Sequence, residues 1–492
     1  MVVALGVRLV VAPSYFGWEE GDYGNLMMIR EVLDSGFTWF RPAHMPGWYV
    51  LGAMARFVGG GERWPALLMT MGFSVASVGL SAWVARRVAG AAAGWLVGLW
   101  LALQPEMLLY GASTLRSPVF TCLGVLGLAL LLRGRELGHA ATAAAFLVRM
   151  EAFFVFFVPS LWSSSWVRGR RLSSAWPAAL GLALVVGVWQ LYLVVGQGET
   201  ELFLARPVGA NTQGEDGLLP GLFTAWHLAT WTLPRKVSWT VIALAAVGLT
   251  AVLRGHGRPG GRAVAAYAGF TLAFWLAEGF VSRQDVNHNL FWVWLMPVLP
   301  PLAILAGIGW SSLAERLRRG RPLAFAAALL SVAPTFRAEV DYQRSRSEAW
   351  YRPQLELARW LEDHAPSGSG MVLGSIPEVW MQRREHPFRV SAWWFLPPDL
   401  RGQPADAVGR FFAEHDVDYV MWFAEEWTDA PGFAPWLAAG EEVTAGPVRF
   451  VPVDREDGYG WIFYVVERDG RTPPRPPAFG QGAPGPGWGP WG

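Results

Sequence analysis

Long apolar segments separated by short charged loops constrain this chain more than any other feature. Only 16% of its residues are charged, whereas an ordinary soluble domain carries about 25%. Crossing a bilayer as a helix takes about 20 apolar residues. Such segments run over 65–85, 91–111, 115–132, 138–149, 151–166, 174–196, 236–254, 263–281, 289–311 and 322–336. With a shortened first helix over 1–12, they predict a polytopic bundle of about eleven transmembrane helices, two of them (138–149 and 151–166) short enough to be half-helices.

The charges between these segments alternate in sign, which predicts the topology. One set of loops carries Arg86, Arg87, Arg133, Arg135, Arg168, Arg170, Arg171, Arg254, Arg258, Arg262, Arg316, Arg318 and Arg319. The other set carries Glu19, Glu20, Asp22, Glu106, Glu199, Glu201, Glu215, Asp216 and Asp285. Arginine-rich loops face the cytoplasm, so the acidic loops and everything after residue 337 are predicted outside. Segment 44–58 is too short to cross and is predicted to lie along the outer surface.

The sequence changes character after residue 337. Residues 348–364 and 405–415 have helical patterns, and 371–373, 418–422 and 461–466 have strand patterns. We therefore divide the chain into a membrane domain over 1–337, an extracytoplasmic α/β domain over 338–470 and a disordered Pro/Gly-rich tail over 471–492. The predicted fold class is mainly α, with this small α/β domain at the C-terminal end.

Several functions are disfavoured by composition and by missing motifs. The net charge of +1 gives no support for nucleic-acid binding. Cys122 is the only cysteine, so no intrachain disulfide and no cysteine-based metal site can form. The sequence has no phosphate-binding loop of an ATP-driven pump and no His-Glu-x-x-His helix. It also has no obvious internal repeat, which argues against a transporter.

An acidic cluster follows the first apolar segment, where Glu19, Glu20 and Asp22 are followed by Tyr23. A carboxylate at this place can accept a proton from a sugar hydroxyl or bind a divalent cation. The cluster can equally be a solvated outer loop, and its local sequence does not decide between these interpretations.

Other polar residues lie at the same predicted edge. Arg116 would bind the phosphate of a lipid-linked sugar, or it would pair with Glu106 or a lipid headgroup. Arg149 and Glu151 would line a cavity or, in the reading we favour slightly, form an ion pair that closes a helix break.

Two further groups of polar residues are candidates for contacts with a phosphate. Arg283 or His288 would steady a phosphate leaving group, or they would belong to an ordinary exposed loop. Lys236, next to Arg235, breaks the sign rule, and it would either reach toward the interface or contact a lipid phosphate.

The order of these features resembles the GT-C class of polytopic glycosyltransferases, which includes protein mannosyltransferases and aminoarabinose transferases. The resemblance covers residues 1–470, and each of its motifs is weak alone. The matching segments are the acidic box 19–23, the surface-helix start 41–49 with His44, the Pro-Tyr turn 104–110, the Arg-x-Glu turn 149–151, and Arg283 before the Pro-rich segment 289–311.

The resemblance implies a bacterial inner-membrane enzyme that moves a sugar from a polyprenyl-phosphate donor to a glycan, lipid or protein acceptor. Glu19, Glu20 or Asp22 would be catalytic. Substrate would be bound by Tyr23, His44, Arg116, Arg149, Glu151, Arg283 and His288. A divalent cation stays an open option.

Two departures from the class leave a non-catalytic relative or a lipid-saccharide transporter as the alternative. Glu19 stands where the class has aspartate, and Arg116 stands where it has an acid.

Overall fold

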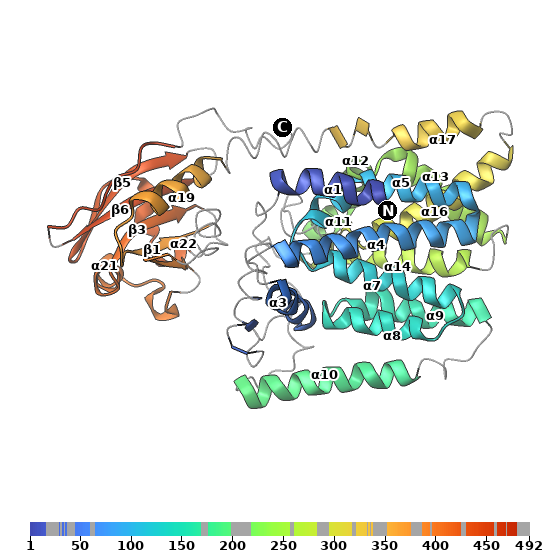
Figure 1. The fold of residues 1–492 in the computed structure, drawn as a ribbon, viewed down its shortest axis with the longest axis horizontal. Helices are drawn as coiled ribbons and strands as arrows, with labels where there is room; N and C mark the ends of the chain where they lie inside the picture. The colour runs from blue at the N-terminus through green and yellow to red at the C-terminus, as the bar shows by residue number, and fades with distance from the viewer. Residues whose placement is uncertain are drawn as a thin grey trace. The chain divides into compact units, whose positions relative to one another are not determined.

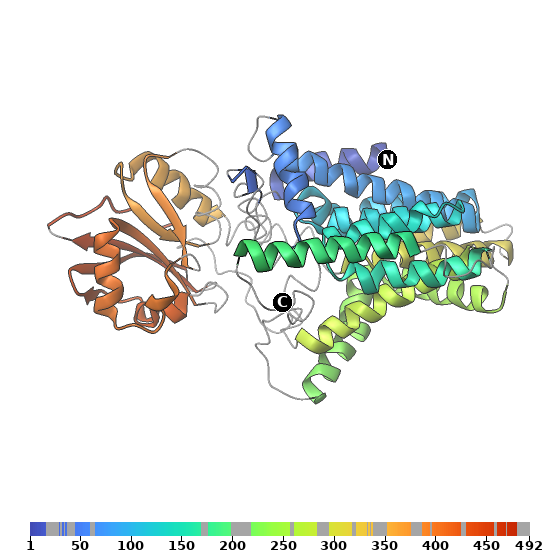
Figure 2. The same ribbon diagram turned by 90° about the horizontal axis from the view of Figure 1, so that it is seen from below.

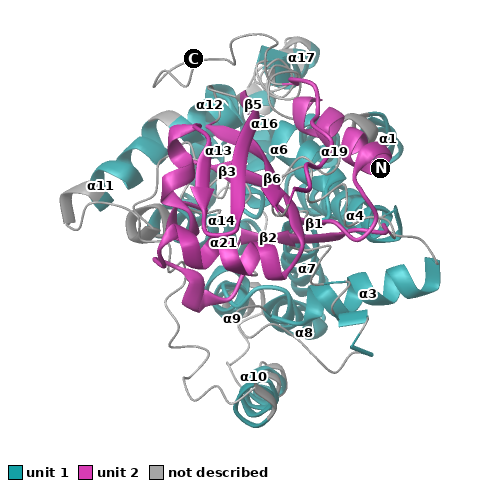
Figure 3. Cartoon of the chain, turned by 90° about the vertical axis from the view of Figure 1, so that its left-hand side faces the viewer, with its two compact units in different colours: residues 1–339 teal, residues 340–492 magenta. Residues whose placement is uncertain are grey.

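The chain was analysed as a computed structural model. It describes residues 1–15, 29, 32–33, 35–36, 45–59, 64–168, 176–197, 218–255, 260–282, 295–316, 321–331, 333–334, 336–337, 352–374, 386–393, 396–424, 430–456, 460–468 and 470–479. The chain divides into two compact units, residues 1–339 and 340–492 (Figure 3).

The first unit is a bundle of helices, and its long members run alongside one another (Figure 1, Figure 2). Helix α4 packs against α5, α7 and α16, and α14 packs against α9 and α16. Proline residues begin α6 and α7 in the first turn, where the missing N–H costs no hydrogen bond. The elements are α1 (Val2–Tyr15), α3 (Gly47–Gly59), α4 (Trp64–Ala89), α5 (Ala91–Leu103), α6 (Pro105–Leu109), η1 (Tyr110–Ala112), α7 (Ser117–Leu132), α8 (Leu137–Ala144), η2 (Ala145–Leu147), η3 (Phe153–Phe157), α9 (Val158–Arg168), α10 (Trp176–Gln197), α11 (Leu218–His227), η6 (Leu228–Thr232), α12 (Leu233–Val237), α13 (Trp239–Leu253), α14 (Gly261–Ser282), α16 (Leu299–Arg316) and α17 (Arg321–Leu330).

The length of the helices bears on the predicted count of about eleven crossings. Among the described residues, α4 alone is long and apolar enough to cross a membrane unbroken. Two bent pairs pass the same test together: Ala91–Leu103 with Pro105–Ala112, bent by 68°, and Gly221–Val237 with Trp239–Leu253, bent by 108°. Shorter apolar helices include Leu137–Leu147 and Phe153–Ser163, which are separate, as the two predicted half-helices are. The total of eleven stays a prediction.

Two glycines set the closest approach of α13 to α16. A Cβ added at Gly248 would strike the carbonyl oxygen of Leu305, and one added at Gly309 would strike that of Leu244. Small residues at such a crossing let two backbones come into contact, which gains dispersion energy where lipid offers no hydrophobic drive. The pair of glycines therefore fixes how these two helices pack.

We expect Gly248→Ala and Gly309→Ala each to destabilise the first unit by about 1–3 kcal/mol, because each added methyl forces two backbones apart. Thermal unfolding of the full-length protein in detergent measures this. The matched control is Gly269→Ala on α14, where nothing lies within 4 Å of the added Cβ. If the control lowers the unfolding temperature as much as the other two, close packing is not the cause.

The second unit is built on a six-stranded sheet in the order β2-β1-β3-β6-β5-β4. Strand β1 pairs in parallel with β2 and β3, and the remaining pairs are antiparallel. The strands are β1 (Gly370–Leu373), β2 (Arg389–Ala392), β3 (Val417–Phe423), β4 (Val443–Ala445), β5 (Val448–Glu456) and β6 (Trp461–Arg468), and the helical elements are α19 (Arg352–His364), η9 (Pro398–Leu400), α21 (Ala405–Glu414), α22 (Ala430–Phe433) and η11 (Pro435–Ala439).

The predicted strands are β1, β3 and β6, while β2, β4 and β5 were missed. Strands β3 and β6 are buried almost throughout, so their sequences are mostly apolar and easy to recognise despite Asp418 in β3. Strand β5 carries Pro452 and charged residues, and its register with β6 shifts between Pro452 and Asp454. A proline within a strand argues against that assignment unless a bulge accommodates it, which is the case here.

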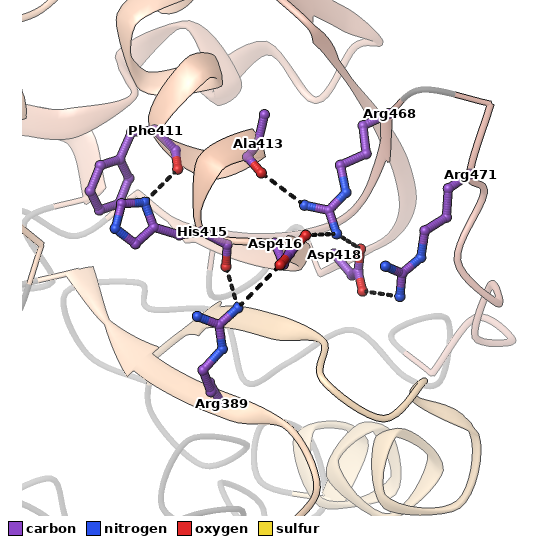
Figure 4. Close-up of polar contacts among 8 residues, drawn as sticks. All are labelled: Arg389, Phe411, Ala413, His415, Asp416, Asp418, Arg468 and Arg471. Atoms are coloured by element: carbon purple, nitrogen blue, oxygen red, sulfur yellow. Dashed lines mark hydrogen bonds and ion pairs between the residues drawn. The ribbon is translucent and has the colours of Figure 1, made fainter.

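An ionic cluster ties the end of the second unit to its sheet (Figure 4). The side chain of Asp418 is fully buried, and its carboxylate accepts hydrogen bonds from Arg468 at 3.2 Å and Arg471 at 3.0 Å. Arg468 also pairs with the exposed Asp416 at 2.9 Å. Two arginines offset the cost of burying one carboxylate, so Arg471 belongs to the folded unit.

Residues 470–479 form a turn and an isolated bridge at Arg471 and then continue without regular secondary structure. The hydroxyl of Tyr419 donates to the carbonyl of Pro474 at 3.1 Å, and the amide of Phe479 donates to Asp454 at 2.8 Å. Hydrogen bonds from Arg475 and Arg449 hold the pKa of Glu467 below its usual value. The sequence predicted a disordered tail from Arg471 onward. These contacts correct that prediction as far as residue 479, and residues 480–492 lie outside the described residues.

We expect Asp418→Asn to destabilise the second unit by about 3 kcal/mol, because two guanidinium groups lose their buried carboxylate. Hydrogen exchange on the full-length protein should show residues 470–479 losing protection. Asp416→Asn is the control, since Asp416 is 61% exposed and asparagine tolerates its positive φ of 52°. We expect the control to cost less than about 1 kcal/mol; equal loss of protection in both variants would contradict this account.

Candidate functional site

The structure describes three of the ten predicted site residues. Glu19, Glu20, Asp22, Tyr23, His44, Arg283 and His288 lie outside the described residues. The other three, Arg116, Arg149 and Glu151, come together where α7 begins and where the chain turns between η2 and η3. The geometry below therefore concerns this group and the segments that hold it.

A buried turn leads to Arg116. Helix α5 ends at Leu103, Gln104 takes an extended conformation, and Pro105 starts the short helix α6. Every residue from Gln104 to Leu115 is buried, and Arg116 is half-buried. A non-helical backbone at this depth needs internal hydrogen-bond partners, because neither lipid nor packed side chains can replace water.

Arg8 on α1 supplies partners for this turn, and the sequence-based prediction missed it. Its side chain is fully buried. The guanidinium donates to the carbonyl of Met107 at 2.6 Å, to Ser74 Oγ at 3.0 Å and to the carbonyl of Ala4 at 2.9 Å. Ser74 Oγ donates to the same Met107 carbonyl at 3.2 Å. A lone arginine inside the apolar segment 1–12 is the sequence signal that could have indicated this role.

A second buried cluster joins the two bends in the bundle. Lys236 Nζ lies 3.6 Å from Glu106 Oε1, and Gln104 Nε2 donates to Glu106 Oε2 at 2.5 Å and to the carbonyl of Lys236 at 2.7 Å. Gln104 marks the bend after α5, and Lys236 precedes the bend at Ser238. Lys236, which broke the sign rule in the sequence, is therefore ion-paired within the protein.

Arg149 and Glu151 form the ion pair that the sequence favoured. Arg149 Nη2 lies 3.0 Å from Glu151 Oε1, with both side chains at most 10% exposed. Arg149 Nη1 lies 3.4 Å from Ser117 Oγ, and the Arg149 guanidinium carbon lies 5.6 Å from the centre of the Phe120 ring. The pair thus ties the turn between η2 and η3 to the first turn of α7.

Arg116 extends this pair into a charged group. Burial disfavours the ionised carboxylate of Glu151, whereas the charges of Arg149 and Arg116 both favour it. Arg116 therefore lies close enough to Glu151 to act on its charge, and it directly precedes Ser117, which contacts Arg149. Arginine presents a planar fork of donors that matches a phosphate, so the chemistry of the group suits an anionic substrate.

Helix α3 begins beside this group. A Cβ added at Gly47 would strike the carbonyl of Leu147, so the first residue of α3 contacts the end of η2. The motif segments 41–49 and 149–151, which are far apart in the chain, are therefore brought close together as far as they are described. Within the described residues, no group of three or more His, Cys, Asp or Glu could hold a metal ion.

The similarity of this chain to known proteins lies in its structure. No protein-family model matches the sequence, and no curated protein matches it. Among solved structures, ArnT from Cupriavidus metallidurans bound to undecaprenyl phosphate aligns with a TM-score of 0.66 over 96% of this chain and 98% of that chain, at 16% identity. The chain has the ArnT fold. Apo ArnT from the same organism aligns with a TM-score of 0.63 at 16% identity, over 94% of this chain and 97% of that chain.

The ArnT fold is the GT-C fold that the order of the motifs predicted. The alignment covers almost all of both chains, so the likeness includes the C-terminal unit as well as the helical bundle. At 16% identity the likeness concerns the fold alone. The roles of this chain's residues must therefore be argued from the contacts that they make.

A double-mutant cycle on Arg149 and Glu151 measures what their pairing contributes. We expect Arg149→Gln and Glu151→Gln each to destabilise the protein by about 3 kcal/mol, because either change leaves a buried charge without its partner. The double variant should recover part of this loss, giving a coupling above about 1 kcal/mol in detergent unfolding.

The exposed pair Arg352 and Glu356, 2.9 Å apart on α19, provides a matched cycle. Its coupling should stay below about 0.5 kcal/mol. A coupling for Arg149 and Glu151 no larger than this would mean that their turn is held by packing instead.

Proposed function

We propose that this chain is a membrane glycosyltransferase that moves a sugar from a polyprenyl-phosphate donor to a hydroxyl group. The observation that carries the proposal is the nearly full-length alignment with ArnT bound to undecaprenyl phosphate. The two arginines Arg116 and Arg149, near the start of α3, support it, because a phosphate-linked donor needs cationic side chains at its site.

The proposed reaction is a displacement at the anomeric carbon. The acceptor hydroxyl attacks this carbon and gives its proton to a carboxylate, Glu19, Glu20 or Asp22. The new oxygen–carbon bond forms as the bond from that carbon to the phosphate oxygen breaks. The electron pair leaves with that oxygen, and the second product is polyprenyl phosphate.

The positive side chains would stabilise the departing phosphate. Arg116 is the described candidate, since it already acts on the charge of Glu151. Arg283 and His288 would share this role, and Tyr23 and His44 would contact the sugar or the acceptor. Arg149, held by Glu151 and near Ser117, would orient the turn that carries Arg116.

We assign the chain to the bacterial inner membrane as a multi-pass protein, with its acidic loops and its C-terminal unit on the extracytoplasmic side. The support is the alternation of arginine-rich and acidic loops. The donor reaches the site through the bilayer, and the acceptor would be a glycan, a lipid or a protein. The carboxylates of the acidic loop would also suit a divalent cation.

A non-catalytic GT-C-like protein is the second candidate. It is favoured by Arg116, which stands where the class has an acid and which acts on Glu151. Such a protein, or a carrier of lipid-linked saccharide, would bind the donor and transfer nothing. The two candidates differ in one measurable property, the appearance of sugar on an acceptor.

Transfer of labelled pentoses and hexoses from undecaprenyl phosphate by the purified full-length protein tests the proposal. We expect transfer by the wild type and a loss of about 10²- to 10⁴-fold in kcat for one of Glu19→Gln, Glu20→Gln and Asp22→Asn, because the acceptor loses its general base. Assays with and without added Mg²⁺ show whether a divalent cation takes part.

Glu356→Gln on the exposed face of α19 is the matched control and should retain full activity. If all three acidic-loop variants stay active, the loop is not catalytic. If the wild type binds undecaprenyl phosphate but transfers nothing from any of these donors, the non-catalytic candidate replaces the enzyme.

A further inference from the structure

Four helix ends meet at one end of the first unit. A Cβ added at Gly260, which precedes α14, would lie 2.7 Å from Leu132 at the end of α7 and 2.8 Å from Val88 at the end of α4. One added at Gly261 would lie 2.9 Å from Val252 at the end of α13. The ends of α4, α7 and α13 and the start of α14 are therefore neighbours.

This end is strongly basic. Each of the four helix ends carries exposed arginines: Arg86, Arg87, Arg133, Arg135, Arg254 and Arg262. Glu136 is the one acid within residues 86–89, 132–136, 252–255 and 260–262, and it is exposed. The negative ends of the α4, α7 and α13 dipoles account for single arginines at these places.

Two of the arginines converge on one indole ring, which helix dipoles do not explain. The guanidinium carbon of Arg133 lies 4.5 Å from the centre of the Trp83 ring, and that of Arg87 lies 5.8 Å from it. Arg87 comes from the same helix as Trp83, while Arg133 reaches over from α7. Residues from two helices therefore bring their guanidinium groups to one exposed end of the bundle, and among the described residues no carboxylate forms an ion pair with Arg133.

We propose that Trp83, Arg87 and Arg133 bind the headgroup of an anionic phospholipid. The phosphodiester would accept hydrogen bonds from the two guanidinium groups, and tryptophan is enriched at the depth of lipid headgroups. Leu137 and Leu253, at neighbouring helix ends, are 63% and 73% exposed, which offers apolar surface for an acyl chain. This combination fits a membrane lipid better than a free phosphate.

The site lies on α4 and α7 at the end opposite the turn that carries Arg116, since Arg116 precedes α7 and Arg133 follows it. It is therefore separate from the proposed transfer site. It requires that the bundle lies in a membrane, but it does not require that the chain is an enzyme.

Native mass spectrometry of the full-length protein, titrated with phosphatidylglycerol or with phosphatidylcholine of the same acyl chains, tests the proposal. We expect wild type to bind phosphatidylglycerol preferentially. The double variant Arg87→Gln with Arg133→Gln should lose at least about tenfold in affinity. Trp83→Leu, which keeps both charges, should lose severalfold and shows that the ring contributes.

The matched control is Arg254→Gln with Arg262→Gln, which removes two exposed charges from the same end of the bundle. We expect its affinity to stay within about twofold of wild type, with circular dichroism showing equal helix content in all variants. An equal loss in this control would overturn the proposal in favour of diffuse charge. Absence of a preference for phosphatidylglycerol, or its displacement by millimolar inorganic phosphate or by equimolar undecaprenyl phosphate, would also overturn it.

Discussion

The buried guanidinium of Arg8 is the interaction on which the interior of the first unit depends. It satisfies the carbonyl of Met107 where α6 departs from the direction of α5. A helix broken among apolar side chains has backbone groups that no solvent can reach. With Arg8 and Ser74 on one side and the Gln104–Glu106–Lys236 cluster on the other, the break becomes a defined turn that places Arg116.

How much of this region the sequence predicts depends on whether a feature is set by neighbouring residues or by residues far apart in the chain. The Pro105 turn, the start of α3 near Gly47 and the pair Arg149–Glu151 are local, and all were recognisable from neighbouring residues. The contact between Lys236 and Glu106 joins residues that are far apart in the chain, and charge alternation gives no partner for either. Arg8 can be recognised in the sequence as an isolated charge. The carbonyl to which it donates a hydrogen bond depends on how α1, α4 and α6 pack.

The same distinction holds in the second unit. Strands β3 and β6 lie at the centre of the sheet and have long apolar runs, 419–423 and 461–466, which make them predictable. Strand β2 lies at the edge and is partly exposed, and β5 tolerates Pro452 through a shift in register. Their place in the sheet comes from pairing with partners, which composition does not encode.

The contact between Asp418 and Arg471 has a consequence for biosynthesis. Strands β1, β2 and β3 are synthesised well before Arg471, so the carboxylate of Asp418 must wait for residues that emerge later. Until then the sheet has a buried acid with only part of its countercharge. The second unit therefore acquires its final stability at the end of synthesis.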